Sequence, residues 1–155
     1  MIIKTPTQYF LARGASDGYK PLNAFDGALL AAGVGNTNLV RMSSIVPPRC
    51  ELIEPARLPL GALVPTAYAS ITSDIPGEWS SAGVAIAWPK DPDLNGLIME
   101  YSALGRRKEI EEIVGTMALE GLKLREWEVR ELKVNAIEYQ VKEVGAVFAA
   151  VVLWG

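Results

Sequence analysis

Two adjacent serines and an asparagine before them could form a reactive site. Ser43 and Ser44 offer hydroxyl nucleophiles, and Asn38 lies six residues before Ser44. If this stretch is one strand, the even spacing puts the Asn38 and Ser44 side chains on the same face, where the amide could polarise a carbonyl or hold an oxyanion. Taken alone, a serine pair is more typical of a turn or strand end, and an asparagine of a turn or cap.

Two carboxylates are the next candidates. Glu100 lies in the apolar sequence IMEY at 98–101, and a carboxyl group in apolar surroundings keeps its proton more readily, as a general acid must. Asp26 lies in a predicted helix, where its carboxylate could bind a guanidinium group through two parallel hydrogen bonds. From the residues alone, an ion-paired glutamate explains Glu100 equally well, and a favourable interaction with the helix dipole explains Asp26 better.

The chain contains no histidine and a single cysteine. The lack of histidine excludes Ser-His-Asp and Cys-His catalysis and the usual zinc and non-haem iron sites. Cys50 is better explained as a small buried side chain than as a reactive thiol. An enzyme with this sequence must therefore use carboxylates, tyrosine or lysine, or carry an unusual electrophile.

The sequence resembles the pyruvoyl-dependent arginine decarboxylase family over nearly its whole length. The resemblance rests on four ungapped segments in the family's order: PLNAFDGALL at 21–30, GNTNLVRMSSIVPP at 35–48, LPLGALVPTAY at 58–68 and GLIMEY at 96–101. No position that carries the family's chemistry departs from the family's pattern.

The resemblance implies an inactive precursor, a zymogen, that cuts itself between Ser43 and Ser44. The Ser44 hydroxyl attacks the Ser43 carbonyl and converts the amide to an ester, and β-elimination then releases a chain that ends at Ser43. The dehydroalanine left at Ser44 tautomerises and loses ammonia to water, which leaves a covalent pyruvoyl group. The two pieces would be 1–43 and 44–155. The first is too small to fold alone, so we expect folding to precede cleavage.

The implied reaction is the decarboxylation of L-arginine to agmatine and carbon dioxide, a lyase step in polyamine biosynthesis or acid resistance. A decarboxylase needs an electron sink for the carbanion. In the family the pyruvoyl ketone provides it through a Schiff base with the substrate, without metal or pyridoxal phosphate. The resemblance makes Glu100 the proton donor and Asp26 the guanidinium ligand. It also makes Asn38 a catalytic residue, and the new carboxy-terminus at Ser43 would help to shape the pocket.

Two alternatives remain open. One is the same chemistry on another amino acid. The other is a non-catalytic trimeric relative that binds a small amine or a partner protein, in which the Ser43–Ser44 bond would stay intact. The joint presence of Ser44, Asn38 and Glu100 favours the enzyme.

The apolar pattern predicts the elements that must position these residues. We expect helices from Pro21 to the glycines at 33 and 35, with Leu22, Phe25, Leu29 and Ala32 on one face, and at 106–122. Strands are predicted at 9–13, 39–45, 61–72, 83–88, 94–101, 127–141 and 145–154, the last two as a hairpin and the final one internal. This order indicates an α+β fold. The resemblance adds a four-layer α-β-β-α sandwich of mostly antiparallel strands with two main helices, assembled as a homotrimer.

Composition points to one compact domain, 1–155. Half of the 155 residues are hydrophobic and the net charge is −3. No basic stripe predicts a nucleic-acid partner, and no apolar run reaches membrane-spanning length. Residues 1–6 lack the pattern of a signal peptide. We therefore expect a cytoplasmic protein with no membrane or nucleic-acid partner.

Overall fold

The computed structural model describes residues 3–155, so the first two residues of the segment 1–6 lie outside it. Two sheets make up most of the chain. The five-stranded sheet has the order β2-β5-β9-β1-β4 and the four-stranded sheet the order β3-β7-β6-β8. The strands of the first sheet are β1 (Gln8–Asp17), β2 (Asn38–Arg41), β4 (Glu51–Leu52), β5 (Leu63–Ser73) and β9 (Gly145–Trp154). Those of the second are β3 (Ile45–Val46), β6 (Trp79–Pro89), β7 (Gly96–Leu104) and β8 (Val129–Gln140).

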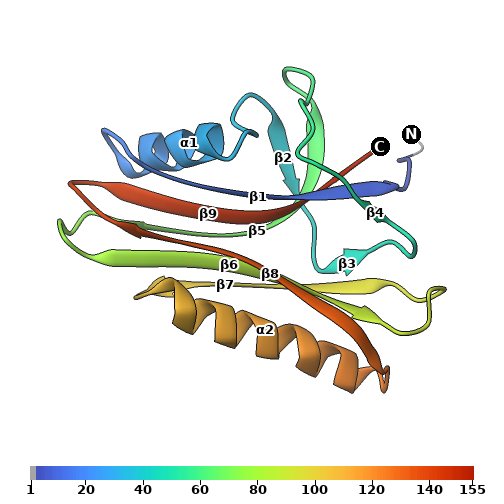
Figure 1. Cartoon of the computed structure of the whole chain (residues 1–155). Helices are drawn as coiled ribbons and strands as arrows, with labels where there is room; N and C mark the ends of the chain where they lie inside the picture. Colours follow the sequence, from blue (N-terminus) through green and yellow to red (C-terminus); the bar gives the residue numbers. More distant parts are fainter. Residues whose placement is uncertain (1–2) are drawn as a thin grey trace.

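The two sheets pack face to face, and one helix covers the outer face of each (Figure 1). Helix α1 (Pro21–Ala31) lies on the five-stranded sheet, and α2 (Arg107–Leu124) lies on the four-stranded sheet. The pairings between the long strands are antiparallel, whereas the short β2 and β4 pair in parallel with β5 and β1. The predicted α-β-β-α sandwich with two main helices is confirmed.

Successive side chains of the central strands point to opposite faces of their sheets and so fill the three interfaces between the layers. On β6, Val84 and Ile86 point into the core between the sheets, whereas Ala85 and Ala87 point toward α2. On β9, Phe148 faces α1. Because β9 is buried on both faces and pairs with β1 and β5, the prediction that the last strand is internal is confirmed.

Helix α1 turns most of the predicted face inward, because Phe25, Leu29 and Ala32 pack against the core, but the prediction is wrong for Leu22. Leu22 is 76% exposed, whereas the small residues Ala24 and Ala28 are fully buried against the sheet. A Cβ atom at Gly14 on β1 would come within 2.3 Å of the Ala28 carbonyl oxygen. Glycine there lets the helix backbone lie directly on the strand, so alanines rather than Leu22 fill the contact.

Two strand predictions are wrong in ways that affect the site. The segment 39–45 is not one strand, because β2 ends at Arg41 and the chain then enters β3 in the other sheet. The segments 127–141 and 145–154 are not a hairpin either, since β8 pairs with β6 while β9 pairs with β1 and β5. In both cases the chain crosses from one sheet to the other, and the apolar pattern of a strand is the same on either side of such a crossing.

Candidate active site

Residues 42–44 carry the chain between the two sheets. The Met42 amide donates a hydrogen bond to the carbonyl of Thr66 on β5 (3.1 Å), and the Ile98 amide on β7 donates one to the carbonyl of Ser44 (2.7 Å). Ser43 is exposed and Ser44 is half-buried. The Ser43–Ser44 peptide therefore spans the gap between two ladders, with its flanks held by different sheets.

Glu100 reaches the same edge of the sandwich from β7. It lies two residues after Ile98, so both side chains are on the face of β7 that looks toward the five-stranded sheet. Its Oε1 atom accepts a hydrogen bond from Nη2 of Arg41. Its Oε2 atom is buried and has no hydrogen-bond partner among residues 3–155. The carboxylate is thus satisfied on one side only.

Arg41 connects the two sheets beside the serines. As the last residue of β2, it donates from Nη2 to the carbonyl of Tyr68 on β5 (2.9 Å) as well as to Glu100. Its guanidinium carbon lies 4.4 Å from the centre of the Tyr68 ring, a cation–π contact. The hydrogen bond that Arg41 donates to Glu100 raises the pKa of Arg41 above its ordinary value.

The ion pair between Arg41 and Glu100 is too exposed to add much to the stability of the fold. The Arg41 side chain is 54% exposed and that of Glu100 is 31% exposed, and pairs of this kind contribute about 0–1 kcal/mol. A buried acceptor without a partner costs about 1–3 kcal/mol. The cost at Oε2 therefore exceeds the gain at Oε1. Such unsatisfied groups are uncommon in native structures and need a specific explanation.

A second link joins β5 and β7 along this edge. The hydroxyl of Ser102 on β7 donates to the carbonyl of Ser70 on β5 (3.1 Å). Because β2 pairs with β5 only as far as Thr66, the β5 carbonyls beyond it are open on that side, and the side chains of Arg41 and Ser102 reach two of them. Side chains therefore hold the Glu100 edge of β7 against β5, in addition to the pairing of β7 within its own sheet.

Asn38 does not share a strand face with Ser44, because β2 ends at Arg41 and Ser44 lies beside the other sheet. The premise of the same-face argument is wrong. The Asn38 side chain is exposed, and its Nδ2 atom donates to the carbonyl of Gly61 (3.2 Å) at the end of the loop before β5. This contact supports the interpretation of Asn38 as a turn or cap residue, and its catalytic role stays a prediction.

Asp26 lies in a different layer from Glu100. It is exposed on α1, which covers the outer face of the five-stranded sheet, whereas Glu100 lies on the four-stranded sheet. The residue before Asp26, Phe25, connects α1 to Arg41 through Tyr68. The Phe25 ring is 6.2 Å from the Tyr68 ring, and Arg41 stacks on that Tyr68 ring. The role of Asp26 in binding a guanidinium group stays a prediction.

Sequence reasoning missed Arg41. The only signal available was a charged residue between the apolar Val40 and Met42, three positions before Ser44. Its partner, Glu100, is 59 positions away in the chain, and spacing cannot reveal such a pair. The structure thus adds one residue to the predicted set and brings it together with Glu100 next to the serines.

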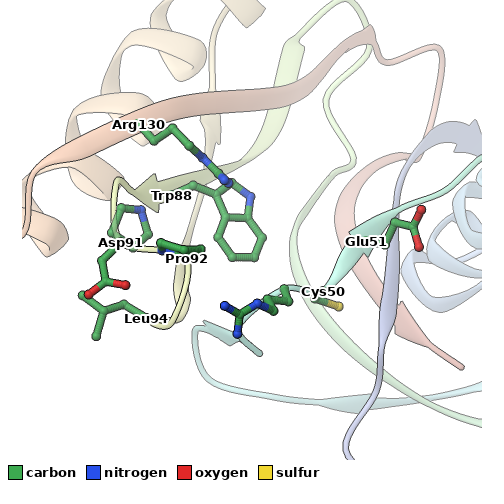
Figure 2. Close-up of a pocket in the computed structure, with 9 residues that line it drawn as sticks. Cys50, Glu51, Trp88, Asp91, Pro92, Leu94 and Arg130 are labelled. Atoms are coloured by element: carbon green, nitrogen blue, oxygen red, sulfur yellow. The ribbon is translucent and has the colours of Figure 1, made fainter.

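A separate pocket of about 290 Å³ opens near the loop that follows β3 (Figure 2). Its lining contains both charges and an indole ring: Arg49, Cys50, Glu51, Trp88, Pro89, Asp91, Pro92, Leu94 and Arg130. Figure 2 shows Arg130 beside Trp88, with its guanidinium carbon 5.6 Å from the ring centre. None of the predicted site residues lines this pocket. Cys50 is buried, which raises the pKa of its thiol and confirms the structural interpretation.

Two other kinds of site were searched for in the part of the chain that the structure describes. No three His, Cys, Asp or Glu side chains come together there as a possible metal site. Neither helix within residues 3–155 combines the length and apolar character needed to cross a membrane.

Comparison with known proteins shows the family of this chain. The sequence model described as pyruvoyl-dependent arginine decarboxylase matches residues 8–154. The chain belongs to this family. The resemblance stated from the sequence is therefore confirmed.

Relatives in the family match along almost their entire length. The pyruvoyl-dependent arginine decarboxylase of Methanocaldococcus jannaschii is 51% identical over 151 residues, which cover 97% of this chain and 92% of the relative. That of Methanococcus aeolicus is 50% identical, with the same coverage. That of Pyrococcus horikoshii is 41% identical over 96% of this chain and 95% of the relative.

A solved structure supports the fold at much lower sequence similarity. The structure of pyruvoyl-dependent histidine decarboxylase at pH 8 superposes with a TM-score of 0.51 at 13% identity. The match covers 61% of this chain and 51% of the other. At this identity the likeness concerns the arrangement of the helices and strands alone.

Proposed function

We propose that this pyruvoyl-dependent family member decarboxylates L-arginine to agmatine and carbon dioxide, with a pyruvoyl group made from Ser44. One observation carries the proposal: the Ser43–Ser44 peptide lies between the two ladders, on the edge where Glu100 has a buried carboxylate oxygen without a partner in residues 3–155. The names of the relatives give the substrate.

The surroundings of the serine pair suit a self-cleavage reaction. In the proposed reaction the Ser44 hydroxyl attacks the Ser43 carbonyl and the peptide nitrogen of Ser44 becomes an amine, so an ester replaces the amide. Elimination across the Ser44 Cα–Cβ bond then releases the Ser43 carboxylate. Hydrogen bonds at Met42 and at the Ser44 carbonyl hold the flanks in two different sheets, so the cut would break neither ladder. Folding thus supplies the alignment that the attack requires.

The pyruvoyl group supplies an electron sink for the carbanion that forms as carbon dioxide leaves. The chain's own side chains would bind the substrate and deliver the proton. We assign Glu100 to protonation of the substrate α-carbon, because its free oxygen is buried and water would not compete there. We assign Asp26 to the substrate guanidinium, Asn38 to the oxyanion of the cleavage step, and the new Ser43 carboxy-terminus to the wall of the pocket.

We also propose that the protein works as a cytoplasmic homotrimer. The exposed position of Asp26 on α1, in a different layer from Glu100, supports an assembly in which a neighbouring subunit helps to complete the site. The oligomeric state can be measured by light scattering on the cleaved protein.

The intact mass of the purified protein under denaturing conditions tests the proposal first. We expect two species, residues 1–43 and a chain that starts at Ser44 and is lighter by one ammonia. The cleaved protein should then release carbon dioxide from arginine much faster than from ornithine or lysine. A single uncut species without activity would contradict the proposal and favour a non-catalytic amine-binding relative. Equal rates on arginine and lysine would contradict the role of Asp26.

A further inference from the structure

Arg41 is restrained from three directions. Its backbone belongs to β2, its Nη2 atom donates to the Tyr68 carbonyl on β5, and its guanidinium lies against the Tyr68 ring. The same Nη2 atom donates to Glu100 on β7. A side chain held in this way has little freedom to turn, although more than half of it is exposed.

These restraints determine how Glu100 is placed. Arg41 occupies Oε1, and the other oxygen, Oε2, is left in the buried space with no hydrogen-bond partner in residues 3–155. If Oε1 were free, rotation of the carboxylate could exchange the two oxygens and let Oε2 reach water. The contact with Arg41 therefore fixes which oxygen faces inward.

We propose that Arg41 is a positioning residue for Glu100, which keeps the Oε2 atom of this carboxylate facing the reacting carbon. This inference rests on the proposed function, in which Glu100 delivers the proton. The contact between Arg41 and Glu100 would join the two cleaved chains, because Arg41 belongs to 1–43 and Glu100 to 44–155. Arg41 would thus allow the small chain to control the geometry of the acid on the large one.

Arginine is better suited to this role than lysine. The planar guanidinium can stack on the Tyr68 ring while it donates to the Tyr68 carbonyl and to Glu100. A lysine ammonium carries the charge but not the flat face or the fixed fork of donors. Substitution by lysine should therefore restore the charge and only part of the orientation.

The test compares R41M and R41K with the wild-type protein, with rates expressed per cleaved site. The intact mass gives the cleaved fraction of each preparation. For R41M we expect kcat for arginine to fall about 10²-fold, as misplacement of a reacting group by about 1 Å can do, with KM little changed. R41K should fall between R41M and the wild type. A kcat for R41M equal to that of the wild type would overturn the inference.

A double-mutant cycle shows whether Arg41 acts through Glu100. If it does, R41M should cause almost no further loss of kcat in an E100Q background. Equal fold losses in both backgrounds would assign Arg41 a separate role and overturn the inference. R49M is a matched control, because Arg49 is also exposed and paired with one carboxylate, that of Asp93 at 2.7 Å. It should leave kcat and KM unchanged.

The outcomes separate this inference from the proposed function. A wild-type protein that is uncut, or cut but inactive on arginine, contradicts the proposed function itself. An active wild type with a fully active R41M contradicts only the positioning role. If R41M fails to cut itself, R41K takes its place in the cycle. If neither variant cuts itself, the inference is also overturned, because a residue that acts only on Glu100 should leave cleavage intact.

Discussion

Two carboxylates of the sandwich, Asp17 and Glu100, differ in how completely they are satisfied. Asp17, at the end of β1, accepts hydrogen bonds on both oxygens from the backbone N–H groups of 142, 143 and 144 (3.2, 2.7 and 3.2 Å) and from the Tyr139 hydroxyl (2.8 Å). Glu100 accepts one side-chain hydrogen bond on Oε1, and its buried Oε2 has no partner within residues 3–155.

Under the proposed function, the difference separates a structural carboxylate, Asp17, from one that delivers a proton, Glu100. Asp17 holds the turn that takes the chain from β8 in one sheet to β9 in the other. Burial raises the pKa of Asp17, but its hydrogen bonds, first the one from the Glu143 N–H, outweigh this and leave the pKa below its ordinary value. Burial and the contact with Asp17 raise the pKa of Tyr139 to about 12. Both Asp17 oxygens have hydrogen-bond partners, whereas the buried Oε2 atom of Glu100 has none within residues 3–155.

The largest effect should come from the serine pair. S44A removes the attacking hydroxyl, so we expect a single uncut chain by mass and no detectable release of carbon dioxide from arginine. The other adjacent pair, Ser80–Ser81, provides the control. The Ser81 hydroxyl donates to the Gly105 carbonyl (2.7 Å), so S81A should cost about 1 kcal/mol of stability and still cut itself. Cleavage of S44A at the normal position would contradict the role of Ser44.

Replacement of Glu100 or Asp17 by the corresponding amide should have different effects on kcat. E100Q removes the proposed proton donor but not the cleavage serine, so it should cut itself while kcat falls about 10²–10⁴-fold. D17N should leave kcat per cleaved site unchanged. Steady-state decarboxylation, normalised to the cleaved fraction, measures both. A fully active E100Q would remove the distinction drawn between the two carboxylates.

The free energy of unfolding should show the reverse order, with D17N having the larger effect and E100Q the smaller. In the uncut S44A background, D17N should lower the free energy of unfolding by about 1–3 kcal/mol at neutral pH, because several donors lose a charged acceptor. The pKa of Asp17 is lowered on folding, so its contribution is present above the ordinary aspartate range and is lost as the pH falls. Urea denaturation at pH 7 and at decreasing pH should show the difference shrink. E100Q in the same background should be much less destabilising than D17N.

The smallest effect concerns Glu138, a satisfied carboxylate at the surface. It accepts from Arg106 Nε (2.9 Å) and Nη2 (3.2 Å) and from the Arg107 N–H (2.8 Å) at the start of α2. The hydrogen bond from Arg106, followed by that from the Arg107 N–H, lowers the pKa of Glu138 to about 2. E138Q should therefore destabilise the S44A protein less than D17N, and added salt should weaken the effect. This contribution should be complete above about pH 4.5, decline as the pH falls below that value, and disappear toward about pH 2.

The sequence predicted the long elements better than the crossings between them. The apolar periods of α2 and β9 reflect burial in the folded chain, so their presence and the internal position of β9 were predictable. The close contact of Ala24 and Ala28 in place of Leu22 was not, because it depends on the missing Cβ of Gly14 on β1. The break at Arg41 was also not predictable, since the residues on both sides of it read as strand.

The candidate site could be predicted only in part, for the same reason. The motif marked Ser44 and Glu100, and the register of β3 with β7 places Ser44 opposite Ile98, two residues before Glu100. It did not mark Arg41, whose proposed role rests on a contact across 59 positions. The expected alignment of Asn38 with Ser44 failed because it assumed one strand where the chain changes sheets.

The position of β1 has a consequence for how the cleaved protein would refold. β1 lies between β9 and β4, and β2 lies at the far edge beside β5, so strands from 1–43 and strands from 44–155 are interleaved within one sheet. Once cut, a fully unfolded molecule would have to recover this sheet from two separate chains. Its refolding would be second order and dependent on concentration, whereas the uncut chain refolds in a first-order process. The lifetime of the mature enzyme would then depend on how slowly it unfolds, not on how well it refolds.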